Sequence, residues 1–331
     1  MNRILRPNIM DVTIFFMIAF ALFLALFGFN ASVDHFPPSF LNLNTIFLSI
    51  LIEALPFVLI GVLIAGIIQI FVKEDHIERL IPKNKYVAVL MSCVVGALFP
   101  ACECGIVPIV RRLVSKGVPI YAAMGFMSTG PLINPIVIAS TYMAFGNDAK
   151  IAALRMGLGF VTAIMVALAV SWLFKGNQFK ASMTITHTHA VSKRETVSSR
   201  FWSMLTHSID EFFDMAKYLI MGAFLAAFVQ TYMPAKALLQ AGNGPVSSLL
   251  VMMGLAYILS LCSEADAFIG ASFSSIFPTS SILGFLIFGP MIDLKNTLMM
   301  LSVFRFKFVM IVLALVASLV FITITLMQSF L

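Results

Sequence analysis

The chain has 331 residues, of which 60% are hydrophobic and only 11% are charged, and its mean hydropathy is +1.02. A soluble protein averages roughly 45–50% apolar and about 25% charged residues, because polar groups must cover its surface. The composition therefore excludes a soluble enzyme, a nucleic-acid-binding domain and a disordered regulator. We attribute the formal net charge of +6 to basic loops on the cytoplasmic side of the membrane, where Lys and Arg residues are enriched.

Nine apolar stretches follow one another along the chain, and a spanning helix needs about 20 mostly apolar residues. The first is expected to be a retained signal anchor, which together with an outer loop forms residues 1–44. Residues 175–207 are polar and basic, which is typical of a cytoplasmic linker between two halves, residues 45–174 and 208–331. The apolar stretches lie near residues 12–30, 45–72, 87–110, 119–144, 150–174, 208–233, 247–275, 279–292 and 298–328.

The two halves share short motifs in the same order, which indicates an internal duplication. The spacing between partners stays almost constant, and this makes the ordered set more informative than any single pair. The partners are Glu53 and Asp214, Gly61 and Gly222, and Gln69 and Gln230 at an offset of 161, Cys102 and Cys262 at 160, and Gly130-Pro131 with Asn134 and Gly289-Pro290 with Asp293 at 159.

Charge counts indicate how the halves are oriented. If each half contains one re-entrant stretch, 14 Lys and Arg residues fall in loops on the cytoplasmic side and 6 in loops on the outer side. If all nine stretches cross the membrane, the numbers are 12 and 8, so the arrangement with re-entrant stretches is favoured. Residues 279–292 are too short to span a bilayer and are therefore expected to be re-entrant. The sequence thus predicts an all-α polytopic membrane protein with an inverted repeat, broken or re-entrant helices and, by this count, seven crossings.

A Cys-Glu-Cys triplet in the first half lies where a helix is expected to be interrupted. Pro100 and Pro108 each lack a backbone N–H and strain a helix. Cys102 and Cys104 would point roughly 200° apart in a regular helix, so their thiols can act together only if the helix unwinds. Glu103 is an ionisable group at membrane depth, which makes it a functional candidate.

The matching segment of the second half, Leu261–Asp266, also combines a thiol with carboxylates. Interrupted helices in inverted repeats form the midplane binding sites of secondary transporters. Thiolates suit soft ions such as zinc, cuprous copper or trivalent arsenicals, and carboxylates add charge and a protonation site. Small packing residues at helix crossings are the alternative interpretation of the cysteines. We predict a substrate or ion site made of Cys102, Glu103, Cys104, Cys262, Glu264 and Asp266, with Cys102, Cys104 and Cys262 as metal ligands.

A third matched pair of interruptions contains Gly-Pro, which breaks a helix. Asn134 and Asp293 follow three residues later and can either cap a new helix or offer an oxygen to an ion. Ser128 and Thr129 can line a pathway or bond to a backbone carbonyl. We add these four residues to the predicted substrate or ion site. The alternative, that the two interruptions are turns with no ligand role, has equal weight.

Other charged residues in apolar segments have simpler interpretations. Asp214 and Lys217 are three apart on an expected helix and can pair with each other. Glu53 at the start of the matched span is expected to snorkel at the interface. A cationic cluster of Arg111, Arg112 and Lys116 could attract an anionic solute, lipid phosphates or a partner.

The run Cys102-Glu-Cys-Gly-Ile-Val-Pro108, with Arg111-Arg112, Lys116-Gly-Val-Pro119 and Asn134-Pro-Ile-Val137, resembles the bacterial predicted permease family that includes the organoarsenical efflux permeases. The likeness covers roughly residues 45–328. It implies a multi-pass protein of the bacterial cytoplasmic membrane with about eight crossings. Some members of that family are tied to efflux of methylated trivalent arsenic. Others lie in zinc-responsive gene neighbourhoods and work with a second membrane subunit, and this sequence looks closer to that second group.

The predicted function is a secondary transporter, not an enzyme, that moves a small inorganic or organometalloid solute. The partners expected are the lipid bilayer and a second membrane subunit, with no nucleic acid and no cofactor. The sequence contains no Walker loop, so a gradient would drive transport with a carboxylate as proton carrier. Two alternatives stay open: a non-transporting membrane subunit that anchors or gates a partner protein, and a membrane-embedded enzyme that uses Glu103 or Asp266 as acid or base on a lipid-linked substrate.

Overall fold

The computed structural model describes residues 38–71, 81–82, 84–100, 102–174, 176, 178–180, 197–232 and 244–328. Within these residues the regular structure is helical, apart from an isolated bridge between Phe179 and Phe304. This confirms the predicted all-α polytopic class. The helices are α2 (Pro38–Phe71), α4 (Lys85–Leu98), α5 (Glu103–Ser115), α6 (Ile120–Ile133), α7 (Pro135–Ala144), α8 (Ala149–Leu173), α10 (Val197–Tyr232), α12 (Pro245–Leu259), α13 (Ser263–Ser272), α14 (Thr279–Met291), α15 (Leu294–Val303) and α16 (Phe306–Met327).

The same order of helices occurs in both halves. A long helix, α2 or α10, is followed by four short ones and then by another long helix, α8 or α16. Equivalent short helices begin at equivalent residues of the sequence motifs. The residues that precede them are Cys102 and Cys262 before α5 and α13, Pro119 and Pro278 before α6 and α14, and Asn134 and Asp293 before α7 and α15.

In the first half, α4 and α5 form a helical hairpin beside α6. Gly125 of α6 faces Cys93 of α4, and further along both helices Thr129 faces Gly96. The two helices therefore run in the same direction. The short turn at 116–119 joins α5 to the start of α6, and α5 packs along α6, so α5 runs antiparallel to both. The tip of this first hairpin consequently lies beside the end of α6.

In the second half, α12 and α13 repeat this hairpin beside α14. Gly284 of α14 faces Leu249 of α12, and further along Gly289 faces Ala256, so these helices run in the same direction. Gly289 also faces Asp266 in the first turn of α13, which packs back along α14. The tip of the second hairpin therefore lies beside the end of α14.

Each hairpin tip faces a broken helix at the centre of the molecule. The chain is extended at Asn134 between α6 and α7, and at Ile292 and Asp293 between α14 and α15. Nearly every residue of α6 and α14 is buried. Because these helices are apolar all round, they form the core and not a surface.

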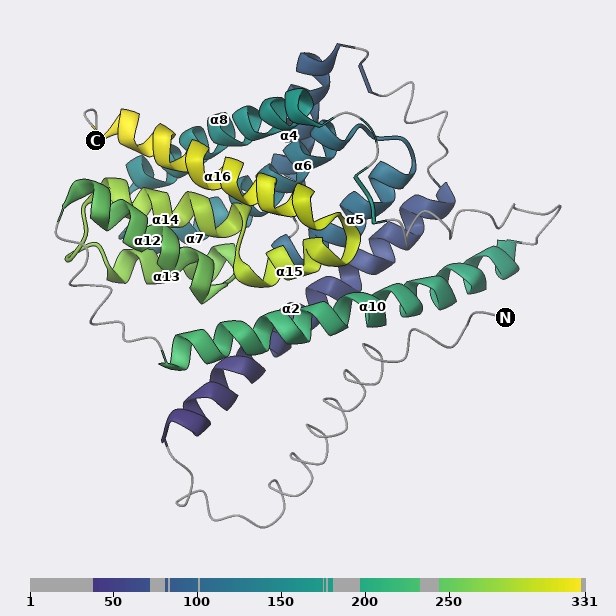
Figure 1. Cartoon of the computed structure of the whole chain (residues 1–331), viewed down its shortest axis with the longest axis horizontal. Helices are drawn as coiled ribbons and strands as arrows, with labels where there is room; N and C mark the ends of the chain where they lie inside the picture. Colours follow the sequence, from purple (N-terminus) through teal and green to yellow (C-terminus); the bar gives the residue numbers. More distant parts are fainter. Residues whose placement is uncertain are drawn as a thin grey trace.

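The long helices enclose this core. Figure 1 shows α2 and α10 crossing along one side of the molecule, while the other helices gather on the opposite side. α2 approaches α5 closely at two facing glycines, since a Cβ on Gly61 would overlap the Gly105 carbonyl oxygen. Small residues permit such close helix contacts in membranes.

Six helical segments of the described chain are long and apolar enough to span a bilayer, three in each half. They are 39–69, 120–144, 149–173, 204–232, 279–303 and 306–327, and α4 and α12 are shorter apolar helices. The resemblance implies about eight crossings, and the charge count seven. The first predicted span, 12–30, lies outside the described residues.

Three boundaries differ from those expected. Residues 279–292, predicted to be re-entrant, form the first part of the broken helix α14–α15, and the chain reverses direction within the α4–α5 and α12–α13 hairpins. The Gly-Pro pairs lie inside α6 and α14, which end two residues or fewer after each proline. α10 begins at Val197, inside the predicted linker 175–207, of which residues 181–196 lie outside the described part.

Candidate functional site

The two cysteines at the hairpin tips occupy equivalent backbone positions. Cys102 and Cys262 each precede a helix in an extended conformation, and neither side chain caps that helix. The C-cap residue of α4 is Phe99, and that of α12 is Ser260, which lies in the left-handed region with φ +48°. The first interruption is thus shorter than expected, because α5 starts at Glu103 and continues through Pro108.

Unwinding at the first tip brings two thiols together. Cys102 and Cys104 contact each other, and Cys104 is buried while Cys102 is half-buried. On the second tip, the half-buried Cys262 contacts the side chain of Glu53 from α2. Glu53 is therefore directed at the hairpin tip and does not simply snorkel. Cys93 is fully buried among Val89, Ala167 and their neighbours.

Lys295 joins the hairpin tips to a helix break. Its Nζ lies 3.0 Å from Oε1 of Glu103 on the first tip and 3.5 Å from Oδ2 of Asp293 at the break. The same Nζ donates a hydrogen bond of 2.8 Å to the carbonyl oxygen of Ser260 on the second tip. Lys295 is only 3% exposed, so one buried ammonium contacts all three features.

A second buried cation, Arg155 of α8, holds the second hairpin. Its Nη1 donates to Oγ1 of Thr141 at 2.6 Å, and its Nη2 donates to the carbonyl oxygen of Ser263 at 3.1 Å. Asp266 and Glu264 lie within electrostatic range of this guanidinium. Each hairpin is therefore bound to the opposite half of the chain by one buried cation.

The centre contains more buried acidic side chains than buried basic ones. Glu103, Asp266 and Asp293 are each 1% exposed, against two buried cations, Lys295 and Arg155. Burying a charge is costly unless it is paired and hydrogen-bonded. Several oxygens of this part of the described chain nevertheless have no hydrogen-bond partner: Oε2 of Glu103, both carboxylate oxygens of Asp266, Oγ of Ser263 and Oδ1 of Asn296. Such oxygens are suited to water or a ligand.

The other predicted site residues have mainly structural contacts. Asn134 accepts a hydrogen bond from the backbone N–H of Val137 at 2.9 Å, and Asp293 accepts one from that of Asn296 at 2.6 Å, so both cap helices. Thr129 donates to a backbone carbonyl one turn earlier in α6, and Ser128 is buried in the same helix.

Two residues close to the predicted site, Lys295 and Arg155, were missed from the sequence, and a third, Glu53, was interpreted only as an interface residue. The signal for Arg155 was available, because it is a cation inside the apolar stretch 150–174. Lys295 falls between two apolar stretches, where a lysine suggests a loop. Its burial becomes evident only when the short helix α15 packs against α5 and α10.

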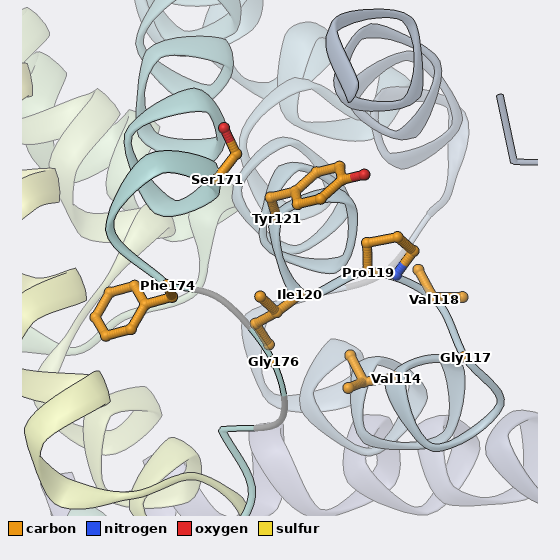
Figure 2. Close-up of a pocket in the computed structure, with 9 residues that line it drawn as sticks. All are labelled: Val114, Gly117, Val118, Pro119, Ile120, Tyr121, Ser171, Phe174 and Gly176. Atoms are coloured by element: carbon orange, nitrogen blue, oxygen red, sulfur yellow. The ribbon is translucent and has the colours of Figure 1, made fainter. Parts of the chain in front are cut away.

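No group of three or more His, Cys, Asp or Glu side chains in the described residues is arranged to hold a metal ion. Joint metal ligation by Cys102, Cys104 and Cys262 therefore stays a prediction. A surface pocket of about 460 Å³ lies elsewhere, between the α5–α6 turn and the end of α8. Figure 2 shows Ser171 close to Tyr121 in the upper part of the view, Phe174 at the left and Val114 at the lower right. None of the predicted site residues lines it.

Comparison with known proteins identifies relatives over most of the chain. A family model described as a predicted permease (ArsP_1) matches residues 39–329. The UPF0718 protein YcgR of Bacillus subtilis is 51% identical over 282 residues, covering 85% of this chain and 95% of the relative. A Streptococcus mutans protein, named as a candidate subunit of a two-component membrane permease complex, is 43% identical over 280 residues, 85% of this chain and 93% of its own length. No solved structure matches the chain.

Proposed function

This chain belongs to the predicted permease family, and from that membership we propose that it is a secondary transporter whose solute passes between the two hairpin tips. It is a multi-pass membrane protein, and we place it in the bacterial cytoplasmic membrane. The observation that carries the proposal is the buried, incompletely hydrogen-bonded group of charges where the tips meet the helix breaks. Ionisable groups at membrane depth are costly, and they mark solute and ion pathways.

The arrangement of spans supports an inverted repeat. Each half contains three candidate spans and one helical hairpin. Three crossings are an odd number, so the second half would enter the membrane from the opposite side to the first. Hairpin tips that meet helix breaks would then lie near the bilayer midplane, as in other inverted-repeat transporters.

The chemistry at the tips favours a soft metal or metalloid species as the passenger. Cys102 and Cys104 contact each other at one tip, Cys262 lies at the other, and carboxylates are close to both. Thiols bind such species and exchange them, and carboxylates supply charge. Because the three cysteines are not gathered around one point, binding would require the tips to approach each other. The carboxylates would also carry the coupling proton.

The experiment is flux into proteoliposomes that contain the purified full-length protein. Wild type should accumulate zinc or a methylated trivalent arsenical, and the double variant Cys102→Ala/Cys104→Ala should lose at least tenfold in rate. Cys93→Ala is the matched control, because this thiol is buried away from the tips. Unchanged flux in the double variant would remove the thiols from the mechanism.

The name of the Streptococcus mutans relative favours a second candidate, in which the chain works as one subunit of a two-component complex. The chain alone would then anchor or gate a partner, or would transport only together with it. Affinity purification from native membranes should recover a second membrane protein in a fixed ratio. If flux in proteoliposomes needs this second protein, the pathway is shared between subunits. Family membership also favours transport over an enzymatic role on lipid-linked substrates.

A further inference from the structure

Lys295 occupies a position where one cation serves two carboxylates. Its ammonium lies 3.0 Å from Glu103 and 3.5 Å from Asp293, and all three side chains are buried. The second oxygen of Glu103 has no hydrogen-bond partner, although it is as deeply buried as the first. One ammonium neutralises a single carboxylate, so this group of three residues lacks one positive charge.

We propose that the passenger enters as a cation, and that Lys295 is a built-in competitor which holds the cation's place between Glu103 and Asp293 until the cation displaces it. This inference builds on the proposed transport function and assigns a charge class to the solute. Lys295 thereby determines specificity, since an anion would have to displace carboxylates that the fold keeps paired.

The structure provides for movement of the ammonium. The Cα of Lys295 packs directly against Gly222 of α10, because a Cβ added to Gly222 would lie 2.9 Å from that Cα. This close contact holds the backbone of Lys295 in place. The four-carbon stem of lysine is flexible, and its compact head can change partners. The Ser260 carbonyl, already 2.8 Å away, can keep one hydrogen bond to the ammonium when the carboxylates bind another cation.

The charges that face this position favour a cation over an anion. Besides Glu103 and Asp293, the groups within electrostatic range of Lys295 include the thiol of Cys104 on α5 and the carboxyl group of Asp266 on α13. The second buried cation at this centre, Arg155, donates hydrogen bonds to Thr141 and to the Ser263 carbonyl. An anion arriving here would meet the carboxylates of Glu103 and Asp293 in a medium where charge interactions are strong.

The test is ligand-induced thermal stabilisation of the purified full-length protein, with Zn²⁺ and inorganic phosphate as separate probes. Lys295→Met empties the position and should be stabilised by Zn²⁺ at concentrations at least tenfold lower than wild type. Lys295→Arg retains the competitor and should resemble wild type. The double variant Glu103→Gln/Lys295→Met should not show this increased sensitivity to Zn²⁺, because it lacks a carboxylate that the cation needs.

Stabilisation of Lys295→Met by phosphate, or no gain with Zn²⁺, would overturn the inference. If Lys295→Met does not fold, Glu103→Gln is compared with wild type instead. The proposal requires that Zn²⁺ stabilise Glu103→Gln less than it stabilises wild type. The binding assay involves no transport. Failure of wild type to move any solute would therefore count against the proposed function, whereas unaltered Zn²⁺ binding counts only against the role of Lys295.

Discussion

Lys295 in the second half of the chain forms a buried ion pair with Glu103 in the first half, at 3.0 Å. Neither residue has a charged counterpart in the repeat. The residue equivalent to Glu103 is Ser263, and the one equivalent to Lys295 is Ile136, which is exposed. The repeated order of helices therefore carries a set of charges that is not repeated, so the two hairpin tips differ in their chemistry.

The close approach of α2 and α5 predicts a loss of stability for Gly61→Ala. The added methyl group would overlap the backbone of Gly105, which cannot move as a side chain can. We expect about 1–3 kcal/mol of destabilisation, the usual cost of overpacking. The measurement is the melting temperature of the purified protein in detergent.

Gly157→Ala is the control for this variant, because a Cβ at Gly157 of α8 would meet nothing within 4 Å. This change should be neutral or slightly stabilising, since alanine favours helix over glycine by up to about 1 kcal/mol. Equal melting temperatures for the two variants would mean that the crossing of α2 and α5 is looser than described.

The ion pairs at the far end of α5 predict a large effect of Glu211→Gln. Glu211 of α10 is buried and binds Arg111 at 3.0 Å and Arg112 through its Nε at 3.0 Å. The arginines are thus engaged within the chain, and the variant removes the one carboxylate that pairs with both guanidinium groups. We expect a loss of about 3 kcal/mol, at the low end for a buried pair because the arginines are partly exposed.

Asp214→Asn on the same helix provides the matched comparison. Asp214 accepts a hydrogen bond from Lys217 at 2.9 Å, which confirms the pairing expected from their spacing, but the carboxylate is exposed. Exposed pairs contribute about 0–1 kcal/mol. Thermal unfolding should therefore separate the two variants clearly, and similar losses would contradict the burial of Glu211.

Asp293 has two contacts that substitutions can separate. Asp293→Asn keeps an oxygen for the N–H of Asn296 but removes the charge that faces Lys295, whereas Asp293→Ala removes both. The alanine variant should be less stable than the asparagine variant by about 1 kcal/mol, the typical value of a helix cap. Asn134→Ala should lose a similar amount relative to wild type in the same unfolding assay, because its cap has no ion pair. A larger loss at Asn134 would indicate a role beyond capping.

Much of the fold follows from local sequence signals. Cysteine-containing interruptions, Gly-Pro pairs and their constant offsets predicted where helices end in both halves, because proline and glycine act on the backbone within one turn. The breaks fall slightly later than expected because α6 and α14 continue past their prolines, and Asn134 and Asp293 then cap new helices.

Which segments fold back depends on contacts that no local pattern contains. The α4–α5 and α12–α13 hairpins pack along α6 and α14. Similar apolar residues occur in every helix of the chain, so the sequence does not indicate which helices pack together. The ion pair of Lys295 is likewise non-local. The sequence predicted Glu103 as a candidate from its depth in the membrane, but its partner lies in the other half.

The most direct test of the central claim is whether water reaches the hairpin tips. In a variant that retains Cys262 as its single cysteine, a membrane-impermeant thiol reagent should label this residue from at least one side of sealed vesicles. Labelling should be at least tenfold faster than in the variant that retains only the fully buried Cys93, because Cys262 is half-buried at a tip. If Cys262 reacts no faster than Cys93 from either side, the tips are packed dry and the transport pathway proposed between them does not exist.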